Sequence, residues 1–99
     1  MTVLMAEAKI RAESVTDVQA AAEKMFAAIN AAQPEGVRYA WWVLPDGETF
    51  VALAQLDDGV ENPIPALPEF QEIQEGLAGW LAEPPNSQAL TVIGSYRLF

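Results

Sequence analysis

The first residues of the chain alternate between apolar and other side chains. In residues 2–12, Leu4, Ala6, Ala8 and Ile10 fall on one side, and charged side chains appear on the other. A period of two predicts a β-strand with one buried face. From residue 15 the apolar positions recur every three or four residues instead, which predicts an amphipathic helix.

The ends of this helix are marked by the sequence. Ser14 is typical of an N-cap, and Asp17, three residues later, completes a short capping box. Pro34 and Gly36 follow the last apolar positions, so the helix is predicted to end near Ala32.

Two β-rich runs, residues 37–44 and 48–56, flank the tripeptide Pro-Asp-Gly at positions 45–47. This tripeptide is typical of a type I turn in which the glycine takes the left-handed bulge position. The two runs are therefore predicted to form a tight antiparallel hairpin, with Leu44 placed opposite Glu48.

The hairpin register decides which side chains share a face. The chosen register sets Trp42 opposite Phe50, and alanines fill the neighbouring positions of that face. The other face then carries Tyr39, Trp41, Val43, Val51 and Leu53. We expect Tyr39 and Trp41 to pack in the core beneath the helices, where the first helix presents small alanines.

The rest of the chain predicts a long proline-containing loop, a second helix and a last strand. Pro68 suits the first turn of the helix, Pro84 and Pro85 end it, and the strand is expected from Leu90 to Phe99. The order β-α-β-β-α-β predicts one α+β domain, residues 1–99, with a ferredoxin-like fold. Its four-stranded antiparallel sheet has the order 4-1-3-2, with both helices on one face.

Two helices cover only one face of such a sheet. Either face of the predicted hairpin is apolar, so the uncovered face would expose a large apolar patch of the kind that marks an interaction surface. A chain of this size also gains stability from burial against a partner. We therefore expect a homodimer that pairs the open faces of two sheets.

Composition removes several kinds of chemistry. The 99 residues contain no cysteine and no histidine, which excludes thiolate nucleophiles, a Ser-His-Asp arrangement and the usual zinc or haem ligands. Fourteen acidic against five basic residues give a formal charge of −9, which disfavours nucleic acid and anionic membranes as partners. The N-terminus has no basic segment followed by an apolar run, so a cytoplasmic protein is expected. We also expect that the protein holds no metal and no cofactor.

The few basic residues suggest a site. Arg38 and Arg97 are both expected on strands and at the same end of the sheet. Such a pair beside an aromatic cavity could hold the oxygen of an enolate or phenolate. Alternatively, these arginines pair with acidic residues such as Asp57 and Asp58, or with the partner subunit, which is the more frequent role of such side chains.

Other candidates surround this position. Trp42 and Phe50 are either walls of an aromatic-substrate pocket or the core of the dimer interface. Glu7 is the best candidate for a general base, since enclosure of a carboxylate in a barrel strengthens it as a base, but an ion pair with a nearby lysine or arginine explains it equally well. Met5 shares a strand face with Glu7, and Asn62 lies in the long loop at the arginine end, so both are added to the substrate site.

The chain resembles the dimeric α/β-barrel superfamily, and within it the antibiotic-biosynthesis-monooxygenase-like group. The resemblance covers nearly the whole length. It rests on the order of elements, the aromatic second strand YAWWVL, the proline-containing loop that leads into PEFQEIQEGL, and the strand that ends the protein. It implies sheets paired into a barrel and a pocket in each subunit, either between the sheet and the helices or within the barrel.

The resemblance also implies possible activities. Some members oxidise polycyclic phenols or quinols with oxygen and no cofactor, and others degrade haem through a histidine ligand, which this chain lacks. The oxygenases use asparagine, tryptophan, tyrosine and arginine, but no asparagine of this chain lies on a predicted strand. The sequence therefore leaves three functions open: a cofactor-independent monooxygenase acting on an apolar phenol or quinol, a non-catalytic small-ligand binding protein, and a structural or regulatory homodimer.

Overall fold

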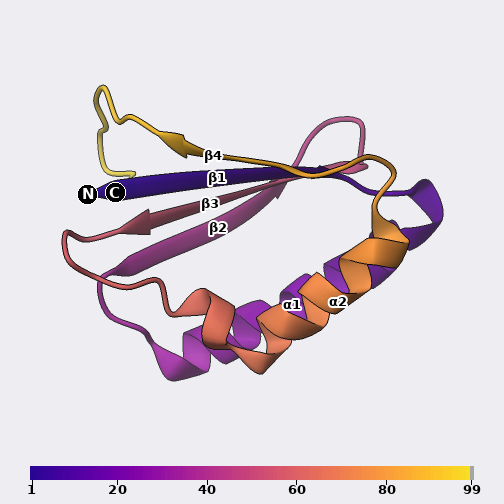
Figure 1. The fold of residues 1–99 in the computed structure, drawn as a ribbon, viewed down its shortest axis with the longest axis horizontal. Coiled ribbons are helices and arrows are strands. Elements are labelled where there is room, and N and C mark those ends of the chain that lie inside the picture. Colours follow the sequence, from indigo (N-terminus) through magenta and orange to yellow (C-terminus); the bar gives the residue numbers. More distant parts are fainter. Residues whose placement is uncertain (99) are drawn as a thin grey trace.

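The computed structural model of the protein describes residues 1–98, and its elements follow the predicted order (Figure 1). The elements are β1 (Thr2–Lys9), the short 3₁₀ helix η1 (Ala12–Ser14), α1 (Val15–Ala32), β2 (Val37–Val43), β3 (Thr49–Leu56), the 3₁₀ helix η2 (Ile64–Ala66), α2 (Pro68–Trp80) and β4 (Asn86–Leu90). Within residues 1–98, no helix is both long and apolar enough to cross a bilayer.

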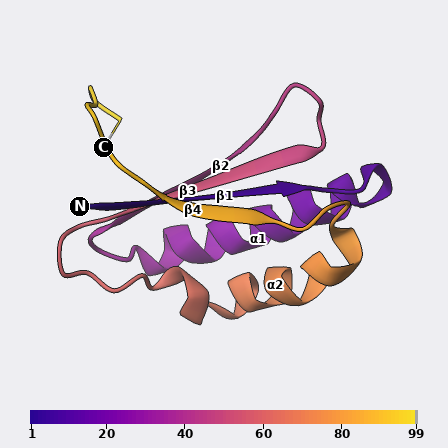
Figure 2. The same cartoon turned by 45° about the horizontal axis from the view of Figure 1, so that its top comes forward.

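The four strands form one antiparallel sheet in the order β2-β3-β1-β4, which is the predicted order read from the other edge. Both helices lie against the same face, and no helix or strand of residues 1–98 covers the opposite face (Figure 2). The ferredoxin-like α+β architecture expected from the sequence is confirmed.

The start of α1 differs from the prediction in its cap. The 3₁₀ turn η1 leads directly into the helix, and the Ser14 side chain makes no capping hydrogen bond. Ser14 already has helical backbone angles, φ −104° and ψ −5°, whereas a capping residue normally has an extended backbone. The predicted end is confirmed: Gln33 adopts a left-handed conformation, φ 48°, directly after Ala32.

The predicted register of the hairpin is wrong by one residue. Val43, not Trp42, lies opposite Phe50, and Leu44 N–H donates to the Thr49 carbonyl at 2.9 Å. The turn is longer than expected because Asp46 accepts hydrogen bonds from the N–H groups of Glu48 and Thr49. A register shift of one residue moves a side chain to the other face of the sheet. Phe50 therefore lies with Trp41 on the helix side, and Trp42 lies on the open side.

The last strand is also shorter and earlier than predicted. β4 pairs with β1 from Glu7↔Asn86 to Val3↔Leu90, and residues 91–98 form no strand. β1 begins at Thr2, so it offers almost no backbone for pairing beyond Leu90. The predicted strand also included Phe99, which lies outside the described residues. Residues 91–98 leave the sheet on the side away from the helices (Figure 2).

The core lies between the sheet and the two helices, in two clusters. One is built on Ile10, Val18 and Phe50, and the other on Met25, Ile64 and Ile73. Trp41 and Leu77 pack against both, and so they connect the two ends of the core. Between these clusters the packing is incomplete, which leaves the cavity described next.

Candidate functional site

A cavity of about 510 Å³ lies between the sheet and α2. The helix contributes Phe70, Ile73, Gln74 and Leu77, and η2 with its preceding loop closes one end. The sheet beneath carries mostly small side chains. Those that line the cavity are Ala6, Ala8, Ala52, Ala54, Ser87 and Ala89. Because these positions lie side by side on β1, β3 and β4, the side chains of α2 cannot reach them and the space stays open.

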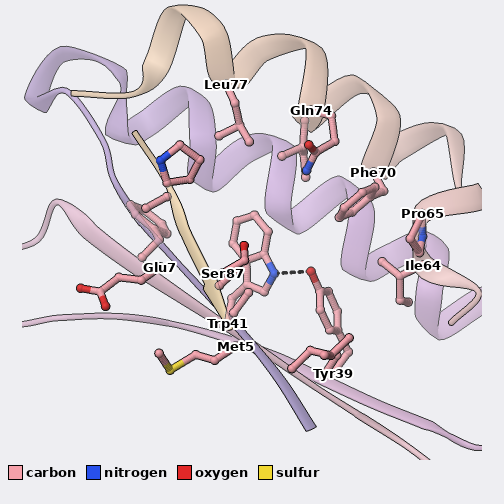
Figure 3. Close-up of a pocket in the computed structure, with 18 of the residues that line it drawn as sticks. Met5, Glu7, Tyr39, Trp41, Ile64, Pro65, Phe70, Gln74, Leu77 and Ser87 are labelled. Atoms are coloured by element: carbon pink, nitrogen blue, oxygen red, sulfur yellow. Dashed lines mark hydrogen bonds between the residues drawn. The ribbon is translucent and has the colours of Figure 1, made fainter. Parts of the chain in front are cut away.

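Aromatic rings form one wall of the cavity. Trp41 and Phe50 meet edge to face with ring centroids 6.4 Å apart, and Phe26 stacks on Tyr39 from the far side at 5.6 Å. Phe70 faces them from α2 (Figure 3). The site therefore offers flat apolar surfaces to a ring-shaped molecule.

One hydrogen bond joins the two β2 aromatics inside this wall. The indole N–H of Trp41 donates to the Tyr39 hydroxyl oxygen at 2.8 Å (Figure 3). Burial raises the pKa of the Tyr39 phenol, and the hydrogen bond from Trp41 opposes part of that rise. At neutral pH Tyr39 is therefore protonated.

Few other polar groups line the cavity. They are Asn62, Gln74 and Ser87, and Asn62 Oδ1 already accepts a hydrogen bond from Ile64 N–H at 3.0 Å. Gln88 also borders the cavity, but it lies opposite Met5 on the open face of the sheet. No lysine or arginine within residues 1–98 lines it. Among the same residues, no cluster of three or more acidic side chains could hold a metal ion. An uncharged ligand is the best match for these surroundings.

Four of the residues proposed from the sequence border this cavity, but not all of them point into it. Phe50 and Asn62 line it, Phe50 through its buried ring. Met5 and Glu7 border it along β1, yet their side chains point away from the helices, toward the open face of the sheet (Figure 3). The Glu7 carboxylate is therefore not placed to accept a proton from a molecule in the cavity.

The other three proposed residues lie outside the cavity. Trp42 is on the open face, 47% exposed, so the predicted pairing of its ring with Phe50 is wrong. Arg38, on the same face, donates to Gln55 Oε1 at 3.3 Å. Arg97 follows the sheet rather than lying on a strand, and its guanidinium stacks over the exposed Tyr96 ring at 5.1 Å.

These positions also test one alternative role given to the arginines, the pairing with acidic side chains of the same chain. Within residues 1–98 neither Arg38 nor Arg97 makes an ion pair with an acidic side chain, whereas Lys9 pairs with Glu48 at 3.9 Å. The two arginines do not converge on the cavity, so the predicted oxyanion-holding pair is not assembled in the single chain.

Sequence reasoning placed Tyr39 and Trp41 on the helix side correctly but treated them as core packing. Gln74 and Ser87 were not considered. The signal that could have revealed the site is the concentration of alanines at alternate positions of residues 4–8 and 52–54, opposite the two β2 aromatics.

No protein-family model matches the sequence, and no curated protein matches it. Solved structures do match. One is an antibiotic biosynthesis monooxygenase that is 13% identical, with a TM-score of 0.74 over 95% of this chain and 100% of that one. Rv0793 from Mycobacterium tuberculosis is 16% identical, with a TM-score of 0.74 over 95% of this chain and 96% of that one.

A third similar structure is SnoaB, a cofactor-independent oxygenase from Streptomyces nogalater. It is 16% identical and has a TM-score of 0.68, over 97% of this chain and 96% of that one. These likenesses extend over nearly the whole chain and confirm the resemblance at the level of the fold: the protein has the fold of the antibiotic-biosynthesis-monooxygenase-like group of α/β-barrel proteins.

Proposed function

We propose that the cavity under α2 binds an uncharged, largely apolar aromatic molecule of the phenol or quinol type, and that the protein acts on it as a cofactor-independent monooxygenase. The observation that carries the proposal is the cavity itself: about 510 Å³, walled by Tyr39, Trp41, Phe50 and Phe70. This volume lies within the ordinary range for small-molecule sites. The likeness to SnoaB supports oxygen chemistry on this fold.

In the proposed reaction the ring system loses a proton to water and reacts with molecular oxygen. For an anthrone, the reacting CH₂ group becomes a carbonyl, one oxygen atom enters the product and the other leaves as water. The chain would hold the ring flat between the aromatic walls.

The test is oxygen consumption with anthrone as the probe, corrected for its spontaneous oxidation. Ala52→Leu narrows the cavity from β3 and should abolish the enzymatic rate. Ala78→Leu, on the exposed side of α2 and outside the cavity, is the matched control and should leave it unchanged. An uncorrected rate equal to that of buffer alone would refute the oxygenase.

A non-catalytic binding protein is the second candidate. Two observations favour it: none of the described residues that line the cavity is a lysine or arginine, and the Glu7 side chain points outward. Binding of anthraquinone, detected by quenching of tryptophan fluorescence, without oxygen uptake from anthrone would support this function over the oxygenase.

We also propose that the open face of the sheet pairs with a second copy of the chain. This face carries the exposed Trp42 ring beside Val51, Leu53 and Met5. The neighbouring segment 91–98 adds Ile93, Tyr96 and Leu98, which are all largely exposed in the single chain. Apolar area of this kind on a small protein is typical of an interface.

A further inference from the structure

The direction of the hydrogen bond between Trp41 and Tyr39 is fixed by chemistry. An indole nitrogen only donates, so the Tyr39 oxygen must be the acceptor. The hydroxyl hydrogen of Tyr39 must then point elsewhere. Among residues 1–98 Tyr39 donates no hydrogen bond, although its oxygen lies in the wall of the cavity.

The groups around the Tyr39 hydroxyl preorganise it as a hydrogen-bond donor. It receives a hydrogen bond from Trp41, which polarises the O–H bond and strengthens its own donation. Phe26 stacks on the ring of Tyr39 and holds it from behind, and Trp41 is itself packed against Phe50. The hydroxyl is thus held in place before any ligand arrives.

We propose that Tyr39, oriented by Trp41, donates a hydrogen bond to a carbonyl or phenolic oxygen of the bound aromatic molecule, so that the cavity selects oxygen-bearing ring systems over bare hydrocarbons. The inference rests on the proposed function and deepens it. Tyr39 determines specificity, and Trp41 is a positioning residue.

Few other groups of the lining compete with Tyr39 as hydrogen-bond donors. Gln74 and Ser87 are exposed, and Asn62 Oδ1 accepts from Ile64 N–H, which leaves the Asn62 amide nitrogen as the other donor held in place. A carbonyl that enters an apolar cavity loses its hydrogen bonds to water, and Tyr39, inside the aromatic wall, is positioned to replace one of them.

The test uses two unreactive probes of nearly the same shape, 9-fluorenone and fluorene, which differ in one carbonyl oxygen. Tyr39→Phe alone would release the Trp41 N–H to donate in its place. The informative protein is therefore the double variant Tyr39→Phe/Trp41→Phe, and the single variant Trp41→Phe is measured for comparison. Affinities are measured by isothermal titration calorimetry, and thermal unfolding verifies that each variant is folded.

We expect the double variant to lose about two- to tenfold more affinity for fluorenone than for fluorene, the effect of one neutral hydrogen bond beyond any change in ring packing that both probes share. The carbonyl stretch of bound fluorenone should lie at lower frequency in the wild type than in the double variant. Trp41→Phe should give an intermediate loss, since it removes the orientation but not the donor.

Equal losses for fluorenone and fluorene, or no loss for either, would overturn the role of Tyr39 while leaving the aromatic cavity intact. Failure of the wild type to bind either probe would refute the proposed function, and this inference with it.

Discussion

The ring of Phe50 meets the ring of Trp41 edge on, with centroids 6.4 Å apart and planes inclined by 74°, on the face of the sheet that the helices cover. Phe50 is 8% exposed and joins Ile10 and Val18 in the core. Replacement of Phe50 by alanine removes a buried ring that anchors both the core and the cavity wall.

We therefore expect Phe50→Ala to lower the free energy of unfolding by about 3–5 kcal/mol. Leu44→Ala, at a 40% exposed position beside the same turn, should cost less than about 1 kcal/mol. Urea denaturation of the two variants measures both values. Similar losses for the two would contradict the placement of Phe50 in the core.

The order of elements was predictable because each of them has a local signal: a change of period, a proline or a glycine. The register was not, because it depends on one side chain. Asp46 accepts hydrogen bonds from Glu48 and Thr49 and so lengthens the turn by one residue. No periodicity in the flanking strands reports that choice, and it moved Phe50 to the opposite face.

Most residues that line the cavity were not identified from the sequence for a related reason. Its floor is made by alanines on three strands that become neighbours only through the sheet order β3-β1-β4. Each alanine, taken alone, is ordinary strand packing. The sequence did predict that Tyr39 and Trp41 face the helices. The space in front of them, however, results from the small side chains of the alanines on the other strands.

Asp46 gives the protein a pH-dependent turn. Hydrogen bonds from the Thr49 hydroxyl and from the N–H groups of Glu48 and Thr49 lower the pKa of its carboxyl from 3.8 to about 2. A carboxyl whose pKa is lower in the folded than in the unfolded state stabilises the fold above pH 3.8, and this stabilisation is lost as the pH falls through about 2.

Asp46→Asn should therefore unfold more easily than the wild type near neutral pH, and the difference should shrink as the pH approaches about 2. Asp57→Asn is the control, since its exposed side chain makes no hydrogen bond within residues 1–98. Urea denaturation across the acidic range measures the difference, and a constant gap between Asp46→Asn and wild type would be inconsistent with this role.

The proposed pairing of open sheet faces predicts a dimer that one charge can break. Trp42→Glu places a carboxylate in the centre of the proposed interface, where burial without a partner is costly. We expect monomer or misfolded protein from this variant. Gln19→Glu adds the same charge on the exposed side of α1 and should remain dimeric.

Size-exclusion chromatography with light scattering gives the oligomeric state, and circular dichroism separates folded monomer from misfolded chain. A wild-type monomer, or a folded Trp42→Glu dimer, would show that the open face is not the interface.

Two glycines of α2 face opposite environments. A Cβ atom on Gly76 would lie 2.5 Å from the Trp80 ring, whereas a Cβ on Gly79 would meet nothing within 4 Å. Trp80 is packed against the cluster of Ile10, Val18 and Phe50, so its ring cannot move aside without disturbing that cluster.

Alanine at a helical position otherwise stabilises relative to glycine by up to about 1 kcal/mol, because it restricts the unfolded chain. Gly79→Ala should therefore raise the melting temperature. Gly76→Ala should lower it, with a net cost of about 1–3 kcal/mol for the displaced ring. Differential scanning calorimetry measures the melting temperature of each variant. Equal stabilisation by both would mean that the Trp80 ring can move away from Gly76, and that this end of the core is packed less tightly than the structure indicates.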